Sequence, residues 1–250
     1  SGFKLPDEVE LELERTILAH RVESNGVHPH PLTVEPSLDA RYLDYLRENF
    51  HHSLRGLKLV IDCGNGASYE LAPSLLRLLG ATVECMGCEP DGRNINLGCG
   101  ALHVDKLQER VKDTGAHAGF AFDGDADRCI GVAADGSIVD GDAALLIVAR
   151  HLLRKGQLGE PIVVSTVMSN LGFEKALQAD GIKLLRAAVG DKYVLEEMIR
   201  SGAKIGGEQS GHVIFLDHAT TGDGLLTALQ VLEVMVETGK PLAELKEGFV

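Results

Sequence analysis

The sequence lacks a hydrophobic run long enough to cross a membrane. Its longest apolar stretch, Ala143 to Ala149, falls far short of the ~20 residues that span a bilayer. The opening residues, SGFKLPDEVE, are acidic and amphipathic and contain no apolar signal-peptide core. We therefore expect a soluble protein with no membrane partner.

Positive charge is also scarce. The chain has 24 Lys and Arg against 37 Asp and Glu, which gives a formal net charge of −13 at pH 7. Because a nucleic-acid binder needs a basic face to neutralise phosphates, this balance argues against a nucleic-acid partner. It leaves open a phosphorylated small molecule, since a metal ion and nearby arginines or lysines can supply the positive charge.

The cysteines form no dense framework. Five are present, at positions 63, 85, 88, 99 and 129. This odd, scattered set predicts reduced thiols and a cytoplasmic protein. Cys85 and Cys88 make one C-x-x-C, but a loop sequence (EPDGRNIN) follows and no second ligand pair occurs, so we do not expect a zinc or redox site there.

Short apolar runs alternate with helical segments along most of the chain. We expect strands at 57–62, 81–85, 117–122, 161–166, 182–187, 203–207 and 212–216, and helices at 37–50, 69–79, 104–111, 143–154, 172–179, 192–199 and 221–236. This rhythm predicts an α/β fold with two consecutive βα-type domains and mixed, largely parallel sheets. Ser37 and Asp191 are expected to cap the helices that follow them.

The first residues do not fit this rhythm. They supply one helix, at 6–20, and a linker rich in Gly and Pro, which together cannot bury a core. We divide the chain into this segment, 1–36, and two domains, 37–137 and 138–250. His28 and His30 in the linker, and His51 and His52 at a helix end, show no metal-ligand spacing and are expected at the surface.

The strongest chemical signal is the segment FDGDADR. Asp123, Asp125 and Asp127 alternate directly after an apolar strand, which lets a loop turn three carboxylates toward one cation. A calcium EF-hand is excluded, because Arg128 and Ala134 stand where that loop needs Gly and Glu. The pattern predicts Mg²⁺ completed by a phosphate oxygen, with Arg128 on the same phosphate; an acidic surface turn is the alternative.

A second signal is GGEQSGH, between two short strands. Gly207 permits a tight loop, while Glu208, Ser210 and His212 offer an acceptor, a hydroxyl and a titratable ring suited to a polyhydroxylated ligand. On composition alone, an ordinary hairpin turn is equally compatible. A third segment, DCGNGA at 62–67, lacks the residues of a P-loop and predicts a tight turn between a strand and a helix.

Together these segments resemble the α-D-phosphohexomutase superfamily over essentially the whole chain. DGDADR is similar to its metal loop and GEQSGH to its sugar-recognition loop, and GEQSGH with INLGCG resembles the branch that acts on glucosamine phosphates. Two local departures are ALHV at 101–104 in place of STHP, and Ala188 where other branches carry a lysine.

The resemblance implies a reversible conversion of glucosamine 6-phosphate into glucosamine 1-phosphate through a phosphoserine and a bisphosphorylated sugar. Its cofactor would be Mg²⁺ on Asp123, Asp125 and Asp127, its partner a phosphorylated amino sugar, and its assembly a homodimer. Arg128 would steady the phosphoryl group, Gly207, Glu208, Ser210 and His212 would bind the sugar, and His212 and Asp191 are the candidate proton carriers.

The family's phosphoserine motif, ASHNP, does not occur in this sequence. The resemblance therefore implies that these 250 residues cover domains 2 and 3 and do not catalyse the reaction alone. Other readings stay open at this point: a phosphomannomutase or phosphoglucomutase, a phosphatase with an Asp nucleophile in DGDAD, and a sugar-phosphate binding module without catalysis.

Overall fold

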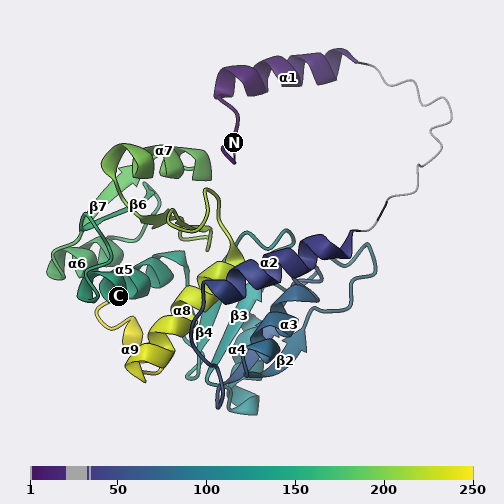
Figure 1. Ribbon diagram of the computed structural model, residues 1–250, viewed down its shortest axis with the longest axis vertical. Coiled ribbons are helices and arrows are strands. Elements are labelled where there is room, and N and C mark those ends of the chain that lie inside the picture. Colours follow the sequence, from purple (N-terminus) through teal and green to yellow (C-terminus); the bar gives the residue numbers. More distant parts are fainter. Residues whose placement is uncertain (1, 21–32, 34, 250) are drawn as a thin grey trace.

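A computed structural model describes residues 2–20, 33 and 35–249, which form two mixed β-sheets flanked by helices (Figure 1). The strands are β1 (Lys58–Asp62), β2 (Thr82–Met86), β3 (Ala118–Phe122), β4 (Cys129–Ala133), β5 (Ile138–Val139), β6 (Ile162–Thr166), β7 (Lys183–Ala187), β8 (Ile205–Gly207) and β9 (Val213–Phe215). The helices are α1 (Asp7–Ala19), α2 (Pro36–Glu48), α3 (Leu71–Leu78), α4 (Asp105–Thr114), α5 (Gly141–Arg154), α6 (Leu171–Ala179), α7 (Asp191–Ser201), α8 (Gly224–Thr238) and α9 (Leu242–Leu245).

The first sheet has the strand order β2-β1-β3-β4-β5. β1 is parallel to both β2 and β3, whereas β3, β4 and β5 form an antiparallel meander. Successive β1 residues face opposite sides: Leu59 and Ile61 join the core beneath α2 and α3, and Val60 packs with α4. This sheet is therefore covered on both faces, as its nearly continuous apolar strands require.

The second sheet has the order β7-β6-β8-β9, with β6 parallel to β7 and β8, and β9 antiparallel to β8. Helices α5 and α6 cover one face, and α7 covers the other with Val194, Leu195 and Met198. Side chains of α5 and α8 join one buried cluster with strands of both sheets, so the two βα units share a continuous core.

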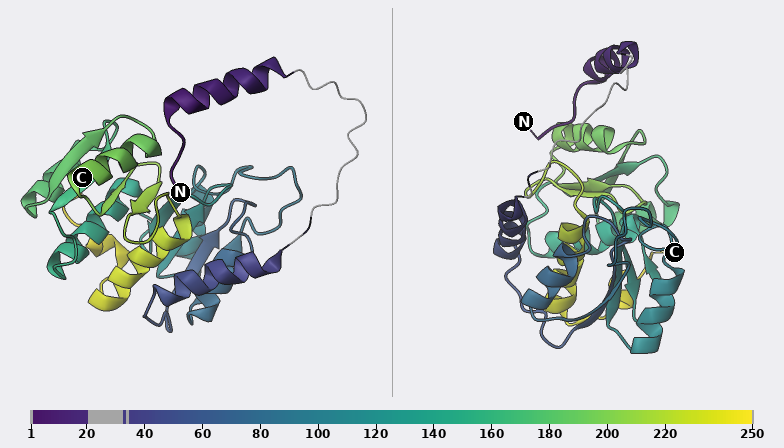
Figure 2. Two further views of the ribbon diagram at one scale, coloured as in Figure 1. Left: turned by 45° about the horizontal axis from the view of Figure 1, so that its top comes forward. Right: turned by 90° about the vertical axis from the view of Figure 1, so that its right-hand side faces the viewer.

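Helix α1 lies apart from both sheets (Figure 2). None of its residues is buried. The N-terminal end of α1 and the residues before it nevertheless reach α7: Asp7 forms an ion pair with Lys192, and Lys4 with Asp191. No helix among the residues with described positions is long and apolar enough to cross a membrane.

The α/β class with two mixed, largely parallel sheets is confirmed. The sequence prediction missed β4 and β5, which extend the first sheet across 129–139. The prediction that Ser37 caps α2 was wrong, because the helix begins at Pro36 and Glu35 is the N-cap, with its carboxylate accepting from the Ser37 N–H.

The two histidines after α2 differ in exposure. His51 is exposed, but the side chain of His52 is only 28% exposed and its Nε2 lies 3.0 Å from Oε1 of Glu237. His52 is therefore partly exposed, and its partner lies far along the chain. His28 and His30, with most of the expected linker, lie outside the described residues.

Candidate active site

The loop 123–128 connects the antiparallel strands β3 and β4, where Phe122 pairs with Cys129. Asp123, Asp125 and Asp127 each direct one carboxylate oxygen into a group whose atoms all lie within 4.8 Å of one another. A hairpin thus brings the three predicted metal ligands together. Oxygen donors at this density suit a hard divalent cation.

The turn at 62–67 holds this loop from one side. Gly64 and Asn65 adopt left-handed backbone conformations, with φ of 57° and 52°, as the expected tight turn requires. The Ala67 N–H donates to the Gly124 carbonyl at 2.8 Å, and a Cβ on Gly66 would lie only 2.3 Å from that oxygen. The metal loop therefore sits directly on the backbone of this turn, which leaves no room for a side chain.

The three carboxylates bring more negative charge together than the neighbouring arginine balances. Burial is the main reason that the pKa of Asp123 rises to about 6; the Arg128 N–H opposes this, and the charges of Asp125 and Asp127 add to it. The Arg128 guanidinium lies 3.9 Å from Asp123 and 3.8 Å from Asp127, and its Nε, although buried, has no hydrogen-bond partner. A cation among the acids would relieve the excess negative charge.

The loop 208–212 joins β8 and β9 as a tight hairpin, with the Glu208 N–H donating to the His212 carbonyl at 2.9 Å. Glu208 Oε1 accepts from the Gly190 N–H at 2.9 Å, and Ser210 Oγ donates to Oε2 at 3.3 Å. A Cβ on Gly207 would lie 2.4 Å from the His212 carbonyl oxygen. The carboxylate is thus fixed beside the exposed Ser210, with acceptor capacity left for a ligand.

The two predicted loops lie against each other. Cys129 at the end of the metal loop donates its N–H to the Gly211 carbonyl at 3.0 Å, and Arg128 and His212 form an isolated antiparallel bridge. Each loop also rests on a helix from the second unit: Gly224 N–H of α8 donates to Ala126, and Gly141 N–H of α5 donates to Gln209. The backbone therefore joins residues distant in sequence into one site.

His212 and Asp191 meet at this junction. His212 is buried, with Nε2 3.5 Å from Asp127 and 3.7 Å from Asp191, and neither of its ring nitrogens has a hydrogen-bond partner within the described part of the chain. Burial alone would raise the pKa of Asp191, but the Lys4 ammonium lowers it. The expectation that Asp191 caps α7 was wrong: Gly190 is the N-cap, and Asp191 is the first helical residue.

Sequence reasoning missed the support beneath Gly207. Its carbonyl accepts from Ser165 Oγ at 2.7 Å, and Ser165 Oγ is in turn hydrogen-bonded to Ser169 Oγ. Asp142, fully buried, accepts from the Asn170 N–H at 2.8 Å in the same region. These residues are separated in sequence and carry no motif, so only the packing of α5 against β6 and β8 reveals them.

Comparison with known families agrees with this geometry. Residues 40–136 match the phosphoglucomutase/phosphomannomutase alpha/beta/alpha domain II, and residues 140–250 match domain III. The chain belongs to this family. The loop 123–128 lies near the end of the first matched segment, and the loop 208–212 lies within the second.

Curated relatives are similar over nearly the whole chain. A phosphoglucosamine mutase of Solibacter usitatus is 55% identical over 98% of this chain and 55% of its own length. The phosphoglucosamine mutase of Heliobacterium modesticaldum is 50% identical over 98% of the chain and 58% of its own length. The chain thus spans about half the length of the curated relatives it matches.

Solved structures share the fold. A phosphoglucomutase/phosphomannomutase family protein from Burkholderia thailandensis superposes with a TM-score of 0.79 at 27% identity, over 99% of this chain and 53% of that one. An N-acetylphosphoglucosamine mutase from Aspergillus fumigatus, in complex with GlcNAc-6P and magnesium, superposes with a TM-score of 0.65 at 18% identity, over 85% of this chain and 49% of that one.

Proposed function

We propose that the protein interconverts glucosamine 6-phosphate and glucosamine 1-phosphate, and that the residues described here supply its cation site and sugar-recognition loop. The observation that carries this proposal is the direct backbone contact between the two loops, Cys129 N–H to the Gly211 carbonyl. A phosphoryl-transfer site needs cationic charge beside the sugar hydroxyl that reacts, and this contact places the two functions side by side.

Asp123, Asp125 and Asp127 hold Mg²⁺ in this proposal. Their convergence within 4.8 Å and the raised pKa of Asp123 are what a site fitted to a divalent cation is expected to show in the cation's absence. The Aspergillus fumigatus relative, solved with magnesium, supports the choice of ion. When bound, Mg²⁺ neutralises charge on the phosphoryl group that is transferred.

Glu208 and Ser210 bind sugar hydroxyls, and Arg128 contributes its guanidinium to the phosphoryl group. The Glu208 carboxylate accepts a hydrogen bond from the Gly190 N–H, so its position does not depend on the ligand. The reaction presents the sugar in two orientations, and a carboxylate accepts hydroxyl hydrogen bonds from either. His212 and Asp191, which lie 3.7 Å apart at the junction, are the candidate proton carriers.

Two further assignments belong to the same proposal. The sequence places the division between the two domains after residue 137; we propose to move it to the end of β5, since that strand still pairs with the first sheet. We also place the protein in the cytoplasm, because all five cysteines are free thiols and none is positioned as a disulfide.

The decisive experiment compares the whole protein with its Glu208→Gln variant in both reaction directions. The amide keeps the shape but loses a charge-assisted hydrogen bond of ~1.5–3 kcal/mol, so kcat/KM should fall roughly 10- to 150-fold in each direction. The exposed Glu160→Gln is the matched control and should leave kcat/KM unchanged. A loss confined to one direction would contradict the role of Glu208.

The same assay separates the proposal from its rivals. Glucosamine phosphates should be turned over with a higher kcat/KM than mannose or glucose phosphates, consistent with the names of the relatives at 50–55% identity. A higher kcat/KM with mannose 6-phosphate would favour a phosphomannomutase. Binding of the sugar phosphate without any turnover would favour a non-catalytic binding module.

A further inference from the structure

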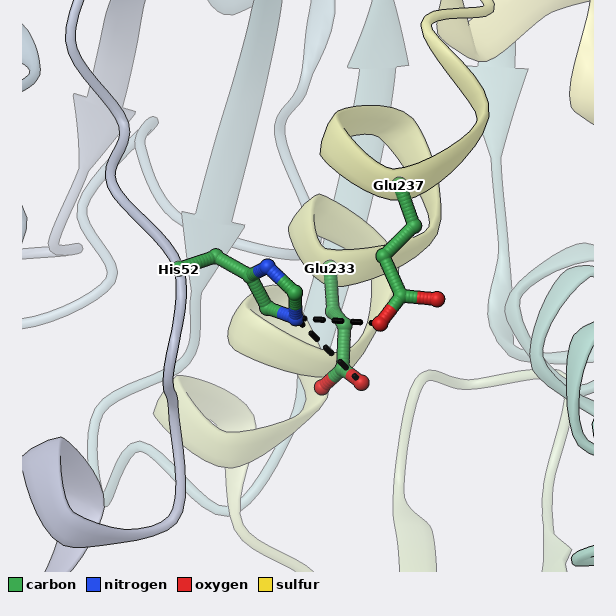
Figure 3. Close-up of side chains that lie close together, drawn as sticks. All are labelled: His52, Glu233 and Glu237. Carbon is green, nitrogen blue, oxygen red and sulfur yellow. Dashed lines mark ion pairs between the residues drawn. The ribbon is translucent and has the colours of Figure 1, made fainter.

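A second group of metal-ligand side chains lies at the opposite end of α8 from the metal loop (Figure 3). His52 comes from the segment between α2 and β1, while Glu233 and Glu237 stand one turn apart on α8. His151 and Lys155, one turn apart at the end of α5, face the same carboxylates. Three separate parts of the chain therefore meet here, and the proposed function uses none of these residues.

The distances are those of a site that could close around one ion. His52 Nε2 lies 3.0 Å from Oε1 of Glu237 and 3.9 Å from Oε1 of Glu233, and all three ligand atoms lie within 4.8 Å of one another. Ligands with bonds of ~2.1 Å in tetrahedral geometry are separated by about 3.4 Å. Small side-chain movements would therefore bring these three atoms to coordination distance.

The ring of His52 is already oriented. It packs edge-on against Phe50, with ring centroids 5.7 Å apart and an interplanar angle of 74°, and Phe50 is itself buried in the core. This contact points Nε2 toward α8, as Figure 3 shows. A preset ligand loses less side-chain freedom on binding than a mobile one.

His151 provides an independent indication of a ligand. Its side chain is 8% exposed, and Nε2 lies at ion-pair distance, 3.0 Å, from Oε2 of Glu237, but this buried nitrogen has no hydrogen-bond partner among the residues that the structure describes. A buried polar atom without a partner is uncommon in folded proteins and asks for an explanation. Here the atom is directed at the carboxylate that also faces His52.

Lys155 now balances the carboxylates, with Nζ 2.9 Å from Glu237 and 3.4 Å from Glu233. The ammonium accounts for the two acids but does not supply a hydrogen bond to His151 Nε2. Because Lys155 is 31% exposed and flexible, it can turn into solvent when another cation binds. Lysine and metal would thus compete for the same oxygens.

We propose that His52, Glu233 and Glu237 bind a divalent transition-metal ion of the Zn²⁺ class, and that His151 orients Glu237 from outside the ligand set. Imidazole nitrogen with carboxylate oxygen is a ligand set that suits Zn²⁺, whereas Mg²⁺ prefers oxygen alone and belongs to the aspartate loop. The bound ion ties the segment before β1 to α8, and so joins the two βα units at the end away from the active site.

The test is a titration of the protein with Zn²⁺ by calorimetry, and with Co²⁺ by visible absorption, in the presence of millimolar Mg²⁺. A Cys85→Ser, Cys88→Ser background removes the competing thiol pair. We expect one ion, with the absorption of tetrahedral Co²⁺ and a raised melting temperature when Zn²⁺ is bound. Absence of binding, or an octahedral Co²⁺ spectrum, would overturn the proposal.

Three variants assign the ion to this cluster. His52→Gln and Glu237→Gln should each weaken Zn²⁺ binding more than 10-fold, because loss of even an outer-shell partner typically costs 10- to 100-fold. Lys155→Gln should tighten it, since the competing ammonium is gone. Asp125→Asn should leave Zn²⁺ affinity unchanged.

The variants are expected to change the Zn²⁺ affinity in opposite directions, so a folding defect cannot explain all of the results. A variant that merely disturbs the fold weakens binding, whereas Lys155→Gln is expected to strengthen it. Unchanged Zn²⁺ affinity in both His52→Gln and Glu237→Gln, or weaker binding in Lys155→Gln, would show that the cluster is an ion-pair network without a metal. Neither result would affect the proposed mutase activity, which is assayed through Glu208.

Discussion

The two charged clusters stand at opposite ends of α8, and they are built in different ways. At the N-terminal end, Gly224 donates its N–H to the metal loop, whose three aspartates are near neighbours in sequence. At the other end, about 20 Å away by helix rise, Glu233 and Glu237 meet side chains from two other parts of the chain. One cluster is local in sequence and the other is assembled only by folding.

Their charge balance differs as well. The aspartate loop gathers acids, and the Arg128 guanidinium lies 3.8 Å from Asp127 and 3.9 Å from Asp123. In the distal cluster, by contrast, Lys155 lies 2.9 Å from Glu237, and its ammonium opposes the burial effect and lowers the pKa of that carboxyl. The fold therefore holds the three aspartates together against the repulsion between their charges. In the distal cluster the lysine and the glutamates instead attract one another.

The largest expected effect comes from breaking the local cluster. Asp125→Asn removes one of three carboxylates and should lower both the Mg²⁺ affinity and the kcat/KM of the whole protein by more than about 100-fold, since three acids are few for a magnesium site. Without Mg²⁺, its free energy of unfolding should stay equal or rise, because like-charge repulsion is relieved. Both are measured by metal titration, coupled assay and urea unfolding.

The exposed Asp113→Asn on α4 is the matched control for that charge change and should alter neither quantity. Turnover of Asp125→Asn at the original rate with unchanged Mg²⁺ dependence would remove the loop from the reaction. A large loss of stability without Mg²⁺ would instead show that the acids are structural.

The same contrast explains what the sequence could predict. The cation-binding role of DGDADR could be predicted because its three acids lie within one loop after an apolar strand. The α/β class could be predicted because the alternation of strands and helices is also visible in short stretches of sequence. The distal cluster could not be read, since His52 is separated from Glu233 and Glu237 by most of the chain. Only the shared core of α5 and α8 brings them together.

The missed strands have a related cause. β4 and β5 follow the metal loop as an antiparallel extension of a sheet that is otherwise parallel, where the alternation with helices stops. The caps failed on a smaller scale: Glu35 and Gly190 occupy the N-cap positions that Ser37 and Asp191 were expected to fill. A local preference names good capping residues, but the path of the entering chain decides which one is used.

A moderate effect is expected at the contact between α8 and the metal loop. A Cβ on Gly224 would lie 2.6 Å from the Arg128 carbonyl oxygen and 2.8 Å from that of Ala126. Gly224→Ala should therefore lower the free energy of unfolding by ~1–3 kcal/mol and weaken Mg²⁺ binding, as overpacking forces the loop and the helix apart. Zn²⁺ binding at the far end of the helix should be preserved in the folded fraction.

Urea unfolding and metal titration measure these effects, and Gly156→Ala is a useful comparison. Gly156 has a positive φ of 66°, and a Cβ added at this position would meet open space. The Gly156→Ala substitution therefore reports the backbone strain alone. Equal losses of stability at the two glycines, with unchanged Mg²⁺ affinity in Gly224→Ala, would show that the metal loop does not depend on α8.

The smallest effect concerns the residue that begins α8. Asp223 caps the helix through the Leu226 N–H at 2.9 Å and accepts from the Tyr42 hydroxyl of α2 at 2.9 Å. Burial raises the pKa of Asp223, although both hydrogen bonds oppose this. The folded state therefore holds this proton more tightly than the unfolded state does, and the contribution of Asp223 to stability declines as pH rises between the unfolded and folded pKa values.

Asp223→Asn keeps an oxygen for both donors and removes that decline, because the amide does not ionise. The stability of the variant relative to the original protein should thus increase as the pH is raised above the ordinary pKa of an aspartate, with the change complete above the raised pKa of the folded state. Urea unfolding at several pH values measures this difference, and Asp113→Asn should show no such trend. A difference that is constant with pH would mean that Asp223 is ionised throughout, and that α8 meets the metal loop with a buried charge stabilised by Tyr42 and the helix N-terminus alone.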